Sequence, residues 1–263
     1  MKKILLVGGD SFTDSNFITY VHPELDVSFP KWPEIIAKKL DMQLVNLAFS
    51  GSGQEQIYSR FVDYINENGS DNIGLAIAAW SQCQRRDYQT HEDYFKTDRD
   101  YWRNDRVNEK GDVFYWTKKS LRYFISFQNL CEVHNIPYKQ FQMISLFDGW
   151  LNGLHKRDTE VAAYLKNPEN FPDFMPRYNY PGDPVKDRKK LIQLLLKYES
   201  SINTNNFLGW PTIKDFSGFY VEEKTIKDKD YKSIPGLVIS EIDGHPTEKG
   251  HEVIAEFIYD RLG

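Results

Sequence analysis

Two short polar segments near opposite ends of the chain carry residue types suited to nucleophilic catalysis. Ser11 closes a Gly-Asp-Ser turn directly after an apolar run at 3–9, and His245 lies in a late Asp-Gly-His-Pro segment. A serine at a strand-to-helix turn can attack a carbonyl when a histidine removes its proton and a carboxylate orients that histidine. Pro246 disfavours the α conformation at His245, which places the imidazole at a loop-to-helix junction. The pattern predicts acyl transfer by Ser11, His245 and Asp243.

Two further turns carry groups that could hold a substrate. Residues 50–53 (Ser-Gly-Ser-Gly) follow a second apolar run, and the backbone amide of Gly51 is a candidate oxyanion donor. A tight turn that needs positive φ at Gly51 is compatible with that role. Trp80 ends a third apolar run and Arg85 follows it, so both are candidate substrate-binding residues. Either Arg85 or its neighbour Arg86 could clamp an acidic group of the substrate, and the alternative is that both are solvated surface charges.

Alternating strands and helices must position these turns. Short apolar runs predict strands at 3–9, 42–48, 73–80 and 138–146. Helical spacing of apolar residues predicts helices at 31–40, 54–67, 117–135, around 191–202 and from about Pro246 onward. This alternation indicates an α/β fold with a parallel sheet, in which ligands bind outside the carboxyl ends of the strands. The candidate residues follow such strand ends.

The chain resembles the SGNH/GDSL hydrolase family of esterases, lipases and carbohydrate deacetylases. The family's first block, Gly-Asp-Ser, is matched at 9–11, and its second block, a glycine after strand two, is matched by Gly51, with Asn46 opening that stretch. The last block is matched by Asp243 and His245, followed by Pro246 and Gly250. The resemblance implies a flavodoxin-like three-layer α/β/α fold. It also implies that Ser11 is the nucleophile and that the Ser11 and Gly51 amides hold the oxyanion.

Two departures from the family pattern affect the expected site. The third block is normally Gly-x-Asn-Asp, and its Asn side chain is an oxyanion donor, but this chain has no Asn there. Ser81 is the positional equivalent, and Gln82 is a second candidate donor. The family also places Asp three residues before His, whereas Ile242 occupies that position here and Asp243 is two residues before His245. If a backbone carbonyl oriented His245 instead, a Ser–His dyad would remain.

We expect a single domain over 1–263 with two large insertions, at about 82–116 and 147–236. The motif order supports one domain, because the nucleophile and the base come from opposite ends of the chain. The first insertion holds eight aromatic and fifteen charged residues, and no regular structure is predicted for it. We expect 82–116 to form a cover beside the active site or a contact surface.

Composition excludes several function classes. A net charge of −5 and a pI near 5.7 argue against nucleic-acid binding and a polybasic membrane anchor. No apolar run approaches the ~18 residues of a membrane span, and the run after Met1 is too short for a signal peptide, so a cytoplasmic location is expected.

The two cysteines form no disulfide framework or zinc motif. No P-loop occurs and Gln56 interrupts a dinucleotide motif, so neither a metal nor an organic cofactor is expected.

The resulting hypothesis is a serine esterase acting on a short-chain ester, such as an acetyl ester, of a polar or carbohydrate alcohol. An O-acyltransferase would use the same residues with a sugar hydroxyl in place of water. A third alternative, motivated by the missing Asn, is a binding or structural module that kept the hydrolase fold. The expected partner is a small-molecule or glycan ester, and the sequence does not indicate an oligomeric state.

Overall fold

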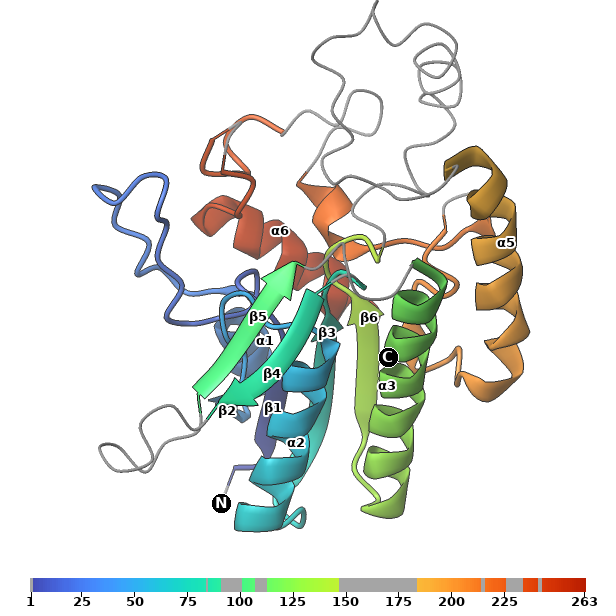
Figure 1. Ribbon diagram of the computed structural model, residues 1–263. Helices are drawn as coiled ribbons and strands as arrows, with labels where there is room; N and C mark the ends of the chain where they lie inside the picture. Colours follow the sequence, from blue (N-terminus) through green and yellow to red (C-terminus); the bar gives the residue numbers. More distant parts are fainter. Residues whose placement is uncertain are drawn as a thin grey trace, which may run out of the picture.

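The computed structural model describes residues 2–83, 85–90, 101–106, 113–146, 184–213, 216–225, 234–240 and 243–263. A parallel five-stranded sheet forms its centre, in the order β2-β1-β3-β6-β7 (Figure 1). The strands are β1 (Ile4–Gly8), β2 (Gln43–Asn46), β3 (Ile73–Trp80), β6 (Tyr138–Gln142) and β7 (Phe207–Leu208). This is the flavodoxin-like order, whose direction reverses between β1 and β3. The predicted fold class is therefore confirmed, and ligands are expected beyond the carboxyl ends of β1 and β3.

Helices cover both faces of the sheet. On one face, α1 (Trp32–Lys39) packs against α6 (Glu248–Tyr259). On the other lie α2 (Gln54–Asn68), α3 (Val113–Val133) and α5 (Pro184–Lys197), with α2 against α3 and α3 against α5 (Figure 1). Two short 3₁₀ helices, η2 (Glu199–Ser201) and η4 (Val221–Lys224), complete the described helical elements.

The two helical layers enclose separate apolar cores, and β1 contributes to both because side chains alternate along a strand. Leu5 and Val7 face the core that α1 and α6 cover, whereas Leu6 faces the core that α2 and α3 cover. Gly8 allows close packing at the end of β1, since a Cβ there would lie 2.5 Å from a ring carbon of Phe61. Burial of these apolar side chains on both faces holds β1 in place, and the end of β1 determines where the turn that contains Ser11 begins.

The segment predicted to lack regular structure contains strands. β4 (Arg85–Thr90) and β5 (Tyr101–Arg106) pair antiparallel, and β4 contacts α2. Helix α3 begins at Val113, before the predicted start at 117, and β7 was not predicted. The expected insertions lie partly outside the described residues, at 91–100, 107–112, 147–183 and 226–233, so they and the single-domain assignment stay predictions.

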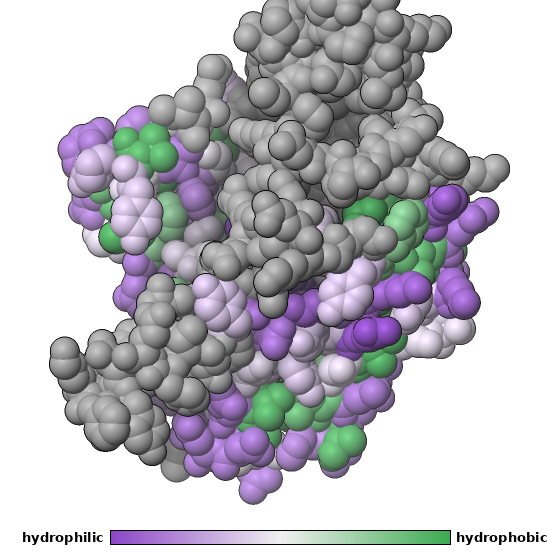
Figure 2. Space-filling model, in the orientation of Figure 1, coloured by the Kyte–Doolittle hydropathy of each residue, from purple (hydrophilic) through white to green (hydrophobic). Residues whose placement is uncertain are grey.

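The loop between β1 and α1 extends from the body of the fold (Figure 1). Figure 2 shows hydrophobic and hydrophilic side chains mixed on the surface of this loop. Its exposed large hydrophobic side chains are Ile18, Tyr20, Val21 and Leu25. Its inner residues contact the segment that carries His245. Separately, no helix in the described part of the chain is both long enough and apolar enough to cross a membrane.

Candidate active site

Ser11 lies in a single helical turn that starts directly after β1. The backbone carbonyl of Asp10 accepts hydrogen bonds from the amides of Thr13 (2.9 Å) and Asp14 (3.0 Å). Only glycine fits before this turn, because a Cβ at Gly9 would lie 2.4 Å from the Thr13 hydroxyl oxygen. The turn thus places the Ser11 side chain beyond the carboxyl end of β1.

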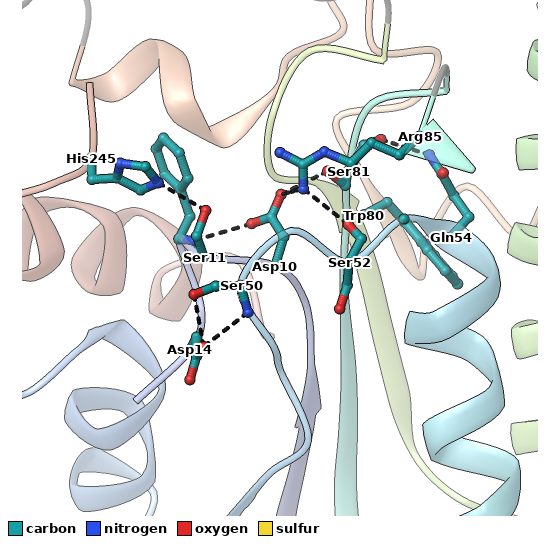
Figure 3. A network of polar contacts seen from close by, with 12 residues as sticks. Asp10, Ser11, Asp14, Ser50, Ser52, Gln54, Trp80, Ser81, Arg85 and His245 are labelled. Atoms are coloured by element: carbon teal, nitrogen blue, oxygen red, sulfur yellow. Dashed lines mark hydrogen bonds and ion pairs between the residues drawn. The ribbon is translucent and has the colours of Figure 1, made fainter. Parts of the chain in front are cut away.

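His245 and Asp243 form a continuous hydrogen-bond chain with Ser11. The Nε2 atom of His245 lies 2.8 Å from the Ser11 hydroxyl oxygen, across 234 residues of sequence (Figure 3). Its Nδ1 atom lies 2.5 Å from Oδ1 of Asp243, so a carboxylate two residues earlier, not a backbone carbonyl, faces this nitrogen. The imidazole also stacks on Phe17 with ring centroids 4.2 Å apart, and Phe12 lies 5.0 Å away. These contacts fix the plane of the ring.

The β1–α1 loop holds the Asp243 carboxylate from the other side. Thr19 donates its hydroxyl hydrogen to Oδ2 of Asp243 over 2.5 Å, and the Asp243 amide donates to the Ser240 hydroxyl over 3.0 Å. Burial opposes ionisation of Asp243, but the hydrogen bonds from Thr19 and His245 outweigh it and lower the pKa of the carboxyl below its ordinary value. An ionised Asp243 only accepts, so Nδ1 of His245 carries a proton and Nε2 is free to accept one.

The Gly51 loop packs against the Ser11 turn through Asp14. Oδ2 of Asp14 accepts from the amide (2.9 Å) and the hydroxyl (2.8 Å) of Ser50 (Figure 3). Gly51 has a φ of 89°, in the left-handed region that favours glycine. Within the described residues, no group accepts a hydrogen bond from the amide of Ser11 or of Gly51. Two adjacent loops therefore offer backbone N–H groups that can bind an anion.

Ser81, the predicted replacement for the missing Asn, directs its hydroxyl elsewhere. It is fully buried and donates to Oδ2 of Asp10 over 2.7 Å. Its carbonyl oxygen accepts from the side-chain amides of Gln54 (2.7 Å) and Gln142 (2.5 Å). The Ser81 hydroxyl therefore bonds to the Asp10 carboxylate and is not directed at Ser11, as an oxyanion donor would be. Gln82 is also buried, and its role as a donor stays a prediction.

Trp80, predicted to bind substrate, lies instead in the core. It has no exposed surface, its indole N–H donates to the side-chain oxygen of Gln140 over 2.9 Å, and its ring packs against Phe124 and Phe127. The end of β3 lines the core on this face because helix α3 covers it. An indole in this position supports the sheet and does not contact a bound ligand.

Arg85 reaches the site from β4. One of its terminal nitrogens, Nη1, lies 3.1 Å from Oδ2 of Asp10 and 3.0 Å from the carbonyl oxygen of Ser52 (Figure 3). Two residues further along the strand, Asp87 accepts from the amides of Gly53 (2.8 Å) and Gln56 (2.9 Å) at the start of α2. Burial raises the pKa of the Asp87 carboxyl. The role of Arg85 in binding an acidic group of the substrate stays a prediction. The sequence did not indicate that Asp10, Asp87 and Thr19 hold the side chains and loops of the site in place.

The fold and the site together define a class of protein: a doubly wound α/β/α protein with a Ser–His–Asp hydrogen-bond chain at the switch point of its sheet. Among the residues that the structure describes, no three His, Cys, Asp or Glu side chains form a group that could hold a metal ion.

Solved structures to which this chain is similar include SGNH/GDSL hydrolases and esterases. They include an acetylxylan esterase from Geobacillus stearothermophilus (11% identity, 100% of this chain and 94% of that chain, TM-score 0.48). They also include a psychrotrophic esterase from Pseudoalteromonas sp. (10%, 99% and 96%, TM-score 0.48) and a member of the lipolytic protein G-D-S-L family from Veillonella parvula (11%, 98% and 96%, TM-score 0.45). No protein-family model and no curated protein matches the sequence.

Proposed function

We propose that this protein is a serine ester hydrolase of the SGNH type, with Ser11 as nucleophile, His245 as general base and Asp243 as the residue that orients His245. The observation that carries the proposal is the hydrogen-bond chain from the Ser11 hydroxyl through both ring nitrogens of His245 to Asp243. A general base must lie within hydrogen-bond reach of the proton it removes, and a separation of 2.8 Å meets that requirement.

In the proposed mechanism, Nε2 of His245 takes the Ser11 proton while the hydroxyl oxygen bonds to the ester carbonyl carbon. The carbonyl π electrons move to the oxygen, and the amides of Ser11 and Gly51 stabilise that negative charge. His245 then gives its proton to the departing alkoxide as the carbon–oxygen bond breaks, which leaves an acyl-serine. A water molecule that gives a proton to His245 then bonds to the acyl carbon, and the bond between that carbon and the Ser11 oxygen breaks. His245 returns the proton to the Ser11 oxygen, so the acid is released and Ser11 is restored. Asp243 stabilises the imidazolium that forms in each half of the reaction.

We propose a short-chain ester of a polar or carbohydrate alcohol as substrate. The composition of 82–116 supports this substrate class, since its aromatic faces can stack on sugar rings and its charged groups can bind hydroxyls. The chain also has no long apolar segment of the kind that would cover a long acyl chain. A panel of p-nitrophenyl esters of increasing chain length would measure the acyl preference, with the highest kcat/KM expected for acetate.

The test of the proposed function compares wild type with Ser11→Ala and with Ser201→Ala, an exposed serine outside the site. Removal of the nucleophile should lower kcat on p-nitrophenyl acetate by at least about 1,000-fold, whereas Ser201→Ala should match wild type. A fluorophosphonate probe should label wild type and not Ser11→Ala. Wild type without turnover or labelling would instead favour the binding-module alternative, and turnover retained in Ser11→Ala would refute Ser11 as nucleophile.

The same acyl-serine would serve an O-acyltransferase if an alcohol replaced water in the second half of the reaction. The two activities differ only in the acceptor, so product analysis separates them. An acyl donor supplied together with a methyl glycoside should yield free acid from a hydrolase. Acylated glycoside as the main product would assign the protein as a transferase.

A further inference from the structure

The proposed oxyanion site has two backbone donors and lacks a third. The Ser81 hydroxyl, which occupies the position of the missing Asn, donates to Asp10. At this position no side-chain donor then supplements the amides of Ser11 and Gly51 on the tetrahedral intermediate. Loss of one oxyanion donor costs about 100- to 1,000-fold in turnover. A nearby buried cation would offset that loss.

Arg85 is such a cation. Its side chain is 8% exposed, and only Nη1 has hydrogen-bond partners among the described residues, namely Asp10 and the Ser52 carbonyl. Figure 3 shows the other terminal nitrogen pointing to the side on which Ser11 and His245 lie. The guanidinium thus stands between the two loops that carry the free amides.

We propose that Arg85 is a catalytic residue that donates a hydrogen bond from its free guanidinium nitrogen to the oxyanion formed at Ser11. The inference rests on the proposed function and names the third donor of that site. When the Ser11 oxygen bonds to the carbonyl carbon, the π electrons move to the carbonyl oxygen, which then carries a full negative charge. Arg85 neither gains nor loses a proton in this step, and the charge disappears when the alkoxide departs with the proton from His245.

The surroundings of Arg85 fix its orientation before substrate binds. Asp10 and the Ser52 carbonyl hold the same nitrogen from opposite loops, and Asp87 on the same strand holds the amides of Gly53 and Gln56. A planar guanidinium can satisfy these partners with one nitrogen and leave other N–H groups free, which an ammonium group cannot do in the same geometry. The low exposure of Arg85 also strengthens its interaction with a developing charge.

The test uses Arg85→Met and Arg85→Lys in the full chain. The control is Arg261→Met, because Arg261 follows the end of α6 and its guanidinium bonds to the carbonyl oxygen of Phe257. On p-nitrophenyl acetate, Arg85→Met should lower kcat about 100- to 1,000-fold with KM changed less than about threefold. Arg85→Lys keeps the ion pair with Asp10 and should retain the wild-type melting temperature, yet lose at least about tenfold in kcat because the free N–H group is lost. A third variant, Arg85→Ala, leaves space for a free guanidinium ion, and guanidinium chloride at millimolar concentration should restore part of its activity.

The possible results separate this inference from the proposed function. Turnover by wild type that depends on Ser11, with kcat unchanged within about threefold in a folded Arg85→Lys or Arg85→Met, would overturn the inference alone. A raised KM confined to p-nitrophenyl monosuccinate, which carries a carboxylate, with unchanged kcat on the acetate would assign Arg85 to substrate binding and also overturn it. A wild-type chain without Ser11-dependent turnover would overturn the proposed function and the inference together.

Discussion

Thr19 offers a direct test of how the Asp243 carboxylate is held. Its hydroxyl donates to Oδ2 of Asp243 over 2.5 Å, and both residues are almost fully buried. The same hydroxyl oxygen accepts from the amides of Val21 and His22, each over 3.2 Å. Thr19→Val keeps the size and the β-branched shape of the side chain and removes only the hydroxyl. The substitution therefore removes the hydrogen bond to the carboxylate together with the acceptor of these two amides.

The expected cost follows from the charge on the acceptor. A hydrogen bond to a charged group contributes about 1.5–3 kcal/mol, so Thr19→Val should lower the free energy of unfolding at pH 7 by about that amount. The lost hydrogen bond favoured the ionised carboxylate, so the pKa of Asp243 in the folded variant should rise. Kinetically, a less firmly held carboxylate should lower kcat and leave KM nearly unchanged, because it acts through the orientation of His245.

The direction in which the free energy of unfolding changes with pH follows from the protonation of Asp243 in the folded and unfolded chains. The pKa of Asp243 is lower in the folded chain than its ordinary value of 3.8, so its ionisation stabilises the fold. That stabilisation is fully present above pH 3.8 and is lost as the pH falls through the folded value. The penalty of Thr19→Val should therefore be full at pH 7 and shrink as the carboxyl becomes protonated at acidic pH.

Urea unfolding at a series of pH values measures this penalty. Thr13→Val is the matched control, because Thr13 is fully buried on the same loop but its hydroxyl has no hydrogen-bond partner. That variant should be as stable as wild type or more stable at every pH, since an unsatisfied buried polar group is removed. Equal penalties for the two variants at pH 7, or a Thr19→Val penalty that does not diminish with acid, would refute the reasoning about Asp243.

Three further outcomes are expected elsewhere in the fold. Asp87→Ala should lower the free energy of unfolding by about 1–2 kcal/mol in a urea titration, because the amides of Gly53 and Gln56 at the start of α2 lose their acceptor; Asp87→Asn should cost less. Burial lowers the pKa of His251 to about 3, so stability should fall as the pH drops below about 6.5, and His251→Gln should remove about one proton from that dependence. Burial raises the pKa of Cys131 to about 12, so iodoacetamide at pH 8 should alkylate Cys131 only after unfolding, as peptide mass mapping would show.

The central sheet could be predicted from the sequence because its strands are buried on both faces. The run at 73–80 forms β3 over the same residues, and the helix predicted at 54–67 forms α2 over Gln54–Asn68. Strand β7 could not be predicted, since a two-residue pairing with β6 has no period of its own. The start of α3 lies in a segment rich in aromatic residues, where helical spacing is hard to separate from general apolarity.

The Ser11, Gly51 and His245 positions could be predicted because each follows a strand end or precedes a helix in a short motif. Thr19 could not, because its contact with Asp243 spans 224 residues and depends on how the β1–α1 loop folds back. The position of Ser81 after β3 predicts an oxyanion donor but does not indicate the direction of its hydroxyl. Its hydroxyl direction is decided by Asp10, a buried carboxylate whose other partner comes from β4.

Strand β4 explains why the charge-rich segment after β3 gave no signal of regular structure. Searches for strands depend on apolar residues that alternate with polar ones, because the buried face of a strand is normally apolar. In β4 the residues that face the protein at i and i+2 are Arg85 and Asp87, both nearly fully buried. Their partners are a carboxylate, a backbone carbonyl and two helix-terminal amides, so charged side chains satisfy this face where apolar ones would leave those groups without partners. Arg86, between these two residues, is charged as well, so the sequence itself shows no alternation of residue types. The buried face of the strand becomes evident only from its packing against the polar loops around Ser11.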